Sequence, residues 1–149
     1  MACADCHTPH KAGPHGAEPD FALGLSGHPQ GLLLQAPAAS SGPWVWGGSG
    51  TNTAFWGPWG VSYAANLTPD ATGLGAWTAD QFVQAMRSGR HAGVGRPIAP
   101  PMPWHSIGQL AEPDLRALFA YLQSQPPVRN MVPGYQPPVP PAARPAAPD

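Results

Sequence analysis

Charged residues are scarce in this chain of 149 residues: Asp, Glu, Lys and Arg make up 10% of it, against about a quarter in ordinary globular domains. The few charges nearly cancel, to a formal net charge of −1 at pH 7, so the chain lacks the basic stripe that binding to nucleic acid requires. It also lacks any run of about twenty apolar residues, so we expect no membrane span. The scattered acidic residues form no paired-carboxylate or Ser/His/Asp pattern, which argues against a hydrolase or a nucleotide-binding site.

Cysteine is equally scarce, and both cysteines lie at the start of the chain, where Cys3-Ala4-Asp5-Cys6-His7 forms C-x-x-C-H. This is the attachment pattern of a c-type haem. Two thiols three positions apart on a short helical turn can form thioethers with the two vinyl groups of the porphyrin. The histidine after the second cysteine can then give the iron an imidazole nitrogen. The motif therefore predicts covalent haem on Cys3 and Cys6, with His7 as an axial ligand.

Three other interpretations of the two cysteines compete with haem attachment. A thioredoxin-like redox pair requires a βαβ context, which the surrounding residues lack. A zinc site requires further ligands, and the chain has no third cysteine. A disulfide between Cys3 and Cys6 would close only a tiny loop and would stabilise little. We therefore favour haem attachment and retain a haem-free thiol redox protein as an alternative.

Glycine and proline are abundant, at 18 and 22 residues, a composition that normally indicates low complexity or disorder. Six Trp, four Phe and three Tyr argue against disorder, because they can bury a large apolar area. A haem would add a further apolar plate on which loops can pack. A chain rich in glycine and proline could then fold around the haem with little secondary structure.

Two segments show the signals of amphipathic helices. Thr78 and Gln81 form a capping box before a helix predicted over 79–88, and a glycine ends it. The second helix begins at Pro113, a residue suited to the first helical position, and ends before two consecutive prolines. Its apolar side chains fall on one face, which we expect to be buried: Leu115, Leu118, Phe119 and Leu122.

The other segments show little periodicity. Residues 8–43 are interpreted as ordered loop. Residues 44–63 carry most of the tryptophans among glycines, which favours a hydrophobic cluster that pins a long loop. A haem-edge wall or docking surface is the alternative. A short hairpin could pair 45–46 with 54–56, and residues 128–149 are typical of an extended polyproline-like tail.

A proline-rich loop over residues 91–109 can present one side chain rigidly. Four prolines between positions 97 and 103 fix φ and reduce the entropy that is lost when the loop is held in one shape. Met102 stands between the last two of these prolines. The loop therefore indicates a site at which a methionine is held in place.

Together these features resemble a class I cytochrome c, and more closely the cytochrome domains of bacterial electron-transfer chains. These include the cytochrome subunits of membrane-bound alcohol and sugar dehydrogenases. The resemblance is carried by CADCHTP (3–9), NLTPD (66–70), GLGAWTADQFVQAMRSGR (73–90), PPMPW (100–104) and EPDLRALFAYLQSQPP (112–127). The haem motif and PPMPW are the specific parts. The family also has a helix before the haem motif, for which almost no residues precede Cys3 here.

The resemblance implies that His7 and Met102 are the two axial ligands of the iron. His105, three residues after Met102 on the same loop, is the main rival for the sixth position, since both His/Met and bis-His haems are known. The remaining histidines are expected to face solvent or to lie in loops: His10, His15, His28 and His91.

Three arginines flank the proposed ligand loop: Arg87, Arg90 and Arg96. They could bind the haem propionates, because a guanidinium pairs well with a carboxylate. Ordinary solvated charge is the alternative interpretation.

The resemblance implies a mainly α fold, a small cytochrome c fold with few helices and long Gly/Pro-rich loops wrapped around one haem. It also implies a cytochrome c domain over residues 1–127, with 44–63 as a Trp-rich loop insertion and 128–149 as a Pro-rich tail. We expect one covalent haem c and an electron carrier, not an enzyme, that moves single electrons by Fe(III)/Fe(II) cycling. The family suggests a dehydrogenase as donor and an oxidase or another cytochrome as acceptor. It also suggests a periplasmic or other extracytoplasmic location, although no signal peptide precedes the motif. A haem enzyme or gas sensor with an open sixth position is the alternative.

Overall fold

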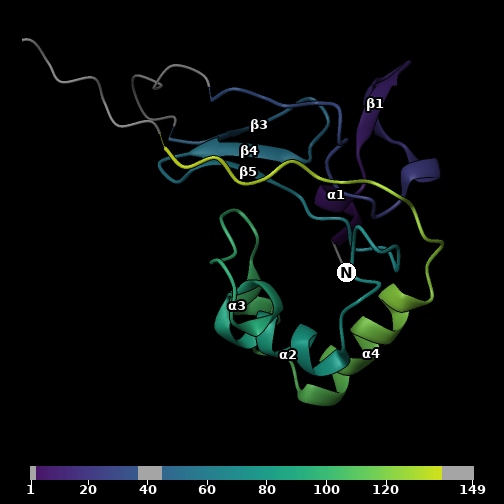
Figure 1. The fold of residues 1–149 in the computed structure, drawn as a ribbon. Helices are drawn as coiled ribbons and strands as arrows, with labels where there is room; N and C mark the ends of the chain where they lie inside the picture. Colours follow the sequence, from purple (N-terminus) through teal and green to yellow (C-terminus); the bar gives the residue numbers. More distant parts are fainter. Residues whose placement is uncertain (1–2, 37–44, 139–149) are drawn as a thin grey trace, which may run out of the picture.

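Figure 1 shows a computed structural model of the chain, which describes residues 3–36 and 45–138. The longest element in these ranges is the last helix, with 12 residues. The elements in chain order are α1 (Cys3–His7), β1 (His10–Gly13), β2 (Gly16–Pro19), the 3-10 helix η1 (Phe21–Leu23), β3 (Gly47–Gly48), β4 (Ala54–Gly57), β5 (Gly60–Tyr63), α2 (Ala79–Ser88), the 3-10 helix η2 (His91–Gly93), α3 (Trp104–Ile107) and α4 (Glu112–Gln123).

The expectation of a mainly α fold is wrong. Helix accounts for 29% of the structure and strand for 16%, and the strands form two antiparallel sheets, β1–β2 and β3–β4–β5. Each strand has at most four residues, too few to show clearly the alternation by which strands are recognised in a sequence. Gly16 and Gly60, which begin β2 and β5, both have positive φ and so permit the tight turns that pair such short strands.

Two of the loop interpretations change accordingly. Residues 8–43 contain the β1–β2 hairpin and are not loop throughout; positions 37–43 lie outside the described residues. A hairpin does form beside the tryptophans, but its first strand is β3, at Gly47–Gly48 rather than 45–46. Trp44, at the start of this segment, also lies outside the described residues.

Helix α2 begins and ends where its capping residues predict. The Thr78 side chain accepts a hydrogen bond from the backbone N–H of Gln81, and the Gln81 side chain accepts one from the backbone N–H of Thr78, so the capping box is confirmed. Gly89 ends the helix in the left-handed conformation, at φ 66°. A β-carbon there would collide with the Trp104 ring, so glycine also lets α3 approach α2.

Helix α4 packs on α2 and forms the hydrophobic core with it. Phe119 lies against Phe82 of α2, with ring centroids 5.4 Å apart. The predicted inward face is confirmed for Leu115, Phe119 and Leu122, which are buried. Leu118 is only partly buried, because its side chain lies at the edge of the contact between α4 and α2.

Leu115→Ala is expected to lower the free energy of unfolding by about 2–5 kcal/mol, because Leu115 is fully buried and the helices cannot close the cavity completely. Leu118→Ala, on the same helix, should cost clearly less. The midpoint and slope of denaturant unfolding of the two variants measure this difference. Equal losses, or no loss at Leu115, would show that the face of α4 is assigned wrongly.

The residues that follow α4 lie along the sheet. Residues 128–138, here called the strap, run as extended chain from the end of α4 across the β3–β4–β5 sheet (Figure 1). Val61 of β5 and Gln136 form an antiparallel bridge, with N–H to O distances between the residues of 2.8 and 3.0 Å. Gly60 has no space for a side chain, because the strap backbone lies against its Cα. Glycine at this position therefore lets the strap pack directly on the sheet.

Asn130 fixes the strap to the N-terminal half of the chain. Its side-chain amide donates hydrogen bonds to the carbonyls of Ser26 (2.7 Å) and His28 (2.9 Å), and its side-chain oxygen accepts one from the N–H of Gln30 (2.9 Å). The residue is 8% exposed. These three bonds connect positions about a hundred residues apart, so the described part of the predicted tail belongs to the packed structure.

Asn130→Ala is expected to destabilise the protein by about 1–3 kcal/mol for each buried group that loses its partner. Arg129→Ala, at the exposed neighbouring position, serves as the control and should change little. Hydrogen exchange of the strap amides, together with denaturant unfolding, measures the effect. Unchanged protection in the Asn130 variant would show that the strap is held by other contacts.

Candidate functional site

Helix α1 places the two cysteines one turn apart on the same side. Both thiols are free and partly buried, and both line one cavity of about 510 Å³. Burial raises the pKa of the Cys3 and Cys6 thiols above the ordinary value, so both are protonated at neutral pH. The pair is therefore presented as two thiols toward a hollow.

His7 follows on the same turn and is 7% exposed. Its Nδ1 lies 2.7 Å from the carbonyl oxygen of Ala65, and since a carbonyl only accepts, Nδ1–H is the donor. The Nε2 lone pair is then free toward the cavities that His7 lines. Burial lowers the pKa of His7, which also favours the neutral ring. A metal-binding histidine is usually a neutral imidazole that binds the metal through one nitrogen and donates a hydrogen bond from the other.

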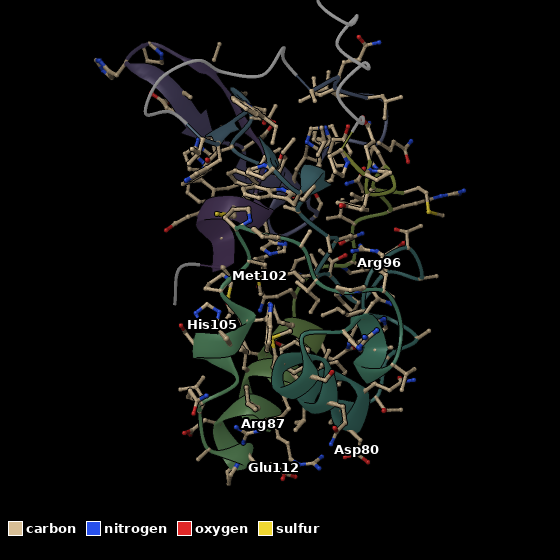
Figure 2. The ribbon with its side chains drawn as sticks, turned by 90° about the vertical axis from the view of Figure 1, so that its left-hand side faces the viewer. Asp80, Arg87, Arg96, Met102, His105 and Glu112 are labelled. Carbon is tan, nitrogen blue, oxygen red and sulfur yellow. The ribbon has the colours of Figure 1, made fainter. Side chains whose placement is uncertain are left out.

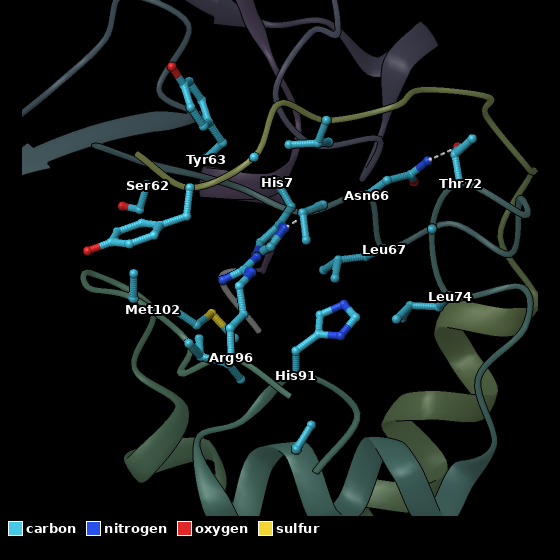
Figure 3. A pocket seen from close by; sticks show the side chains of 18 of the residues that line it. His7, Ser62, Tyr63, Asn66, Leu67, Thr72, Leu74, His91, Arg96 and Met102 are labelled. Carbon is cyan, nitrogen blue, oxygen red and sulfur yellow. Dashed lines mark hydrogen bonds between the residues drawn. The ribbon is translucent and has the colours of Figure 1, made fainter. Parts of the chain in front are cut away.

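Two adjoining cavities meet at this histidine. The cysteine-side cavity, about 510 Å³, is the one lined by Cys3 and Cys6. The strap-side cavity, about 300 Å³, is lined by residues 131–135 of the strap. His7 and Met102 line both cavities. Figure 3 shows them approaching the same space from different elements, His7 from α1 and Met102 from the proline-rich loop.

The loop that carries Met102 is held from two sides. The Ser62 hydroxyl of β5 donates to the carbonyl of Pro100 at 2.5 Å. The N–H of Ile98 donates to the carbonyl of Gly89 at 2.7 Å, which ties the start of the loop to the end of α2. Met102 itself is partly buried. A thioether and an imidazole, the two side-chain types that ligate a His/Met haem, therefore line the same cavities.

The structure does not bring His105 to this space. His105 lies exposed on α3 beside Trp104, and neither cavity is lined by it. His28 lies in a loop, which is one of the two expected placements, but it does not face solvent. His28 is fully buried, with its ring nitrogens 2.9 Å from the Thr53 hydroxyl and 2.7 Å from the carbonyl of Leu32. Thr53 is 25 residues away along the chain, so no local sequence signal marks this burial.

The three arginines have different surroundings. The Arg87 guanidinium donates to the carbonyls of Gly108 and Leu110, beyond the end of α3, and Figure 2 shows it on the part of the helical layer away from Met102. Arg90 donates to the carbonyl of Gly95 at 3.1 Å. Neither lines the cysteine-side or the strap-side cavity, whereas Arg96 lines the strap-side one.

Several lining residues come from the Trp-rich segment, for which the sequence left a wall of the site open only as an alternative. Trp46 and Phe55 line the cysteine-side cavity with ring centroids 6.5 Å apart, so part of the Trp-rich segment forms a wall of the hollow. Tyr63 lines both cavities, and His91 the strap-side one. The tryptophans were the only sequence signal for this wall, and they did not distinguish it from a separate hydrophobic cluster.

The donor set fits a haem better than a bare metal ion. Across residues 3–36 and 45–138, no three His, Cys, Asp or Glu side chains gather as they would around a metal ion. The hollow instead offers one imidazole, one thioether and two thiols on walls that are mainly apolar. Two axial donors and two attachment thiols are the protein groups that a c-type haem uses.

Comparison with known proteins gives the class: the chain is similar to c-type cytochrome subunits of bacterial dehydrogenases, which confirms the resemblance drawn from its motifs. Among these relatives are the fructose dehydrogenase cytochrome subunit of Gluconobacter japonicus, 36% identical over 69 residues, and the gluconate 2-dehydrogenase cytochrome c subunit of Pantoea cypripedii, 40% identical over 65. A subunit of the nicotinate dehydrogenase from Pseudomonas putida is 42% identical over 80 residues.

These matches cover only part of each protein. They span 46%, 43% and 53% of this chain, in the same order, but only 14%, 14% and 7% of the relatives' own lengths. No protein-family model matches the chain. Among the described residues, no helix combines the length and hydropathy of a membrane span.

Proposed function

We propose that this chain is a c-type cytochrome domain that carries single electrons through one covalent haem and transforms no substrate. The observation that carries the proposal is that Cys3, Cys6, His7 and Met102 all line one pair of adjoining cavities. The similarity to cytochrome subunits of dehydrogenases supports the same role.

In this proposal a bound haem supplies an iron that alternates between Fe(III) and Fe(II). Cys3 and Cys6 anchor it by thioether bonds. His7, oriented by the carbonyl of Ala65, and Met102, oriented by its loop, act as the axial ligands. The mainly apolar walls would lower the polarity around the iron, which disfavours the extra charge of Fe(III) and so favours the reduced form.

The haem domain comprises residues 1–127 in this proposal, with 44–63 contributing a wall and the strap packed over one side. The electron donor would be a dehydrogenase and the acceptor an oxidase or another cytochrome. The domain would work in the periplasm or another extracytoplasmic space, as do cytochromes of the class that it resembles.

Two measurements on the purified protein test the proposal: a redox titration, and the intact mass of the chain under denaturing conditions. One covalent haem per chain and a single one-electron wave are expected. More than one wave would contradict the one-haem assignment. Binding of carbon monoxide by the reduced protein at a rate typical of an open site would favour a sensor or enzyme. If the protein is produced in a host that can attach haem covalently and its mass still shows no haem adduct, the thiol redox protein would be favoured.

A further inference from the structure

Among the described residues, Arg96 is a cation without a carboxylate partner, at the edge of the strap-side cavity. The ion pairs in this part of the chain are formed by Lys11 with Asp20 and by Arg116 with Asp80 and Glu112. The Arg96 guanidinium instead donates to the carbonyl of the next residue, Pro97, at 3.3 Å. No described Asp or Glu lines the cavity. The cavity therefore has an available positive charge and no described protein anion to neutralise it.

Arg96 is exposed at the rim of the cavity, and the backbone on which it lies is held by hydrogen bonds. The carbonyl of Arg96 accepts a hydrogen bond from the N–H of His91 at 2.9 Å, and Arg90 and Pro97 form a β-bridge beside it. Figure 3 shows the Arg96 side chain reaching from this loop into the cavity toward His7. Arg90 belongs to the same turn, but its guanidinium is bonded to the carbonyl of Gly95 and lines no cavity.

His91 lies on the same turn and lines the same cavity. Its ring meets the Trp77 ring edge to face, with centroids 4.8 Å apart. Burial, and secondly the charge of Arg96, lowers the pKa of His91, so the ring is neutral at neutral pH. A neutral imidazole can still donate one hydrogen bond to an anion. The other titratable groups lining this cavity are His7, Tyr63 and Tyr135.

The chemistry of haem selects the ligand for this site. Haem carries vinyl groups on one side of the ring and two propionate carboxylates on another. Because the thiols that would bind the vinyl groups line the cysteine-side cavity, a haem attached to them would have room for its propionates in the strap-side cavity, where Arg96 lies. A guanidinium is the side chain that best pairs with a carboxylate, through charge-assisted and often bidentate hydrogen bonds.

We propose that Arg96, rather than Arg87 or Arg90, binds a haem propionate, with His91 as an additional hydrogen-bonding group, and that this contact raises the reduction potential. The proposal rests on the proposed haem function. Arg96 would act through its charge. The positive charge disfavours the extra positive charge of Fe(III), and it keeps the propionate ionised.

The test compares Arg96→Gln and Arg96→Lys with Arg90→Gln as the matched control on the same turn. The reduction potential of each purified haem protein is measured between about pH 5 and 8, where a carboxyl that has lost its counter-charge can titrate. Arg96→Gln should lower the potential at neutral pH. The potential should then rise as the pH falls, because protonation of the propionate removes a negative charge. Arg96→Lys should restore part of the shift, and Arg90→Gln should match the wild type.

A second measurement covers the case in which the Arg96→Gln protein does not acquire covalent haem. Resonance Raman spectra of Arg96→Lys should show a shifted propionate bending mode, while Arg90→Gln should not. A wild-type potential and pH profile in a fully haem-loaded Arg96→Gln protein would overturn the proposal. An equal shift in Arg90→Gln, or an unshifted mode in Arg96→Lys, would do the same. Absence of covalent haem from the wild type would instead overturn the proposed function.

Discussion

Replacing both cysteines by alanine is expected to abolish covalent haem. Cys3 and Cys6 line the same cavity as His7, and the chain contains no other cysteine that could form a thioether. After extraction with acidified acetone, the Cys3→Ala/Cys6→Ala protein should show no haem mass and no haem absorbance, whereas the wild type keeps both. Each single variant should lose one bond and most of its yield.

Asp5→Asn is the matched control, because Asp5 is exposed on the same short helix and lies between the two cysteines. It should retain a full complement of covalent haem. A double-alanine protein with extraction-resistant haem would contradict the assignment of the thiols. Loss of haem from Asp5→Asn as well would mean that α1, rather than its thiols, decides attachment.

The elements that the sequence predicted well are those whose signals are local. Thr78, Gln81 and Gly89 define the ends of α2 through contacts within a few residues, so the pattern and the structure agree. The inward face of α4 follows from a 3.6-residue period, which places Leu115, Phe119 and Leu122 together without knowledge of the partner helix. Its edge was less certain, as the partial burial of Leu118 shows.

The elements that were missed depend on contacts between distant parts of the chain. Strand β5 is stabilised partly by Gln136 of the strap, 75 positions away from its partner Val61. The polyproline-like pattern of the tail could not indicate this bridge, because its hydrogen bonds lie on the non-proline residues. The strands were missed for the same reason. Strands of two to four residues are stabilised by pairing with their partner strands and not by the propensity of their own residues.

The candidate site shows the same division. The spacing of Cys3, Cys6 and His7 was sufficient to predict that they act together, because one helical turn fixes their arrangement. The choice among three arginines was not available from spacing. Arg87 and Arg96 both flank the ligand loop in sequence, yet the Arg87 guanidinium is bonded to carbonyls beyond the end of α3, whereas Arg96 lines the strap-side cavity.

Met102→Ala is expected to remove the sulfur ligand and to lower the reduction potential. A thioether stabilises Fe(II) relative to Fe(III), and axial ligands tune haem potentials over a range of about 0.8 V. The oxidised wild type should therefore show a weak near-infrared band from charge transfer between sulfur and iron. The variant should lack the band, have a lower potential and bind carbon monoxide readily when reduced.

Met131→Ala is the matched control for this prediction. Met131 also lines the strap-side cavity, but it is 64% exposed and lies on the strap, where no proline-rich loop directs its sulfur. It should keep the near-infrared band and the wild-type potential. A band that survives in Met102→Ala and disappears in Met131→Ala would show that Met131 of the strap is the sulfur ligand.

A wild type without the band would exclude both methionines, and His105→Ala would then be the next variant to examine. Ligation by His105 would require α3 to turn, because in this structure the ring is exposed and lines neither cavity.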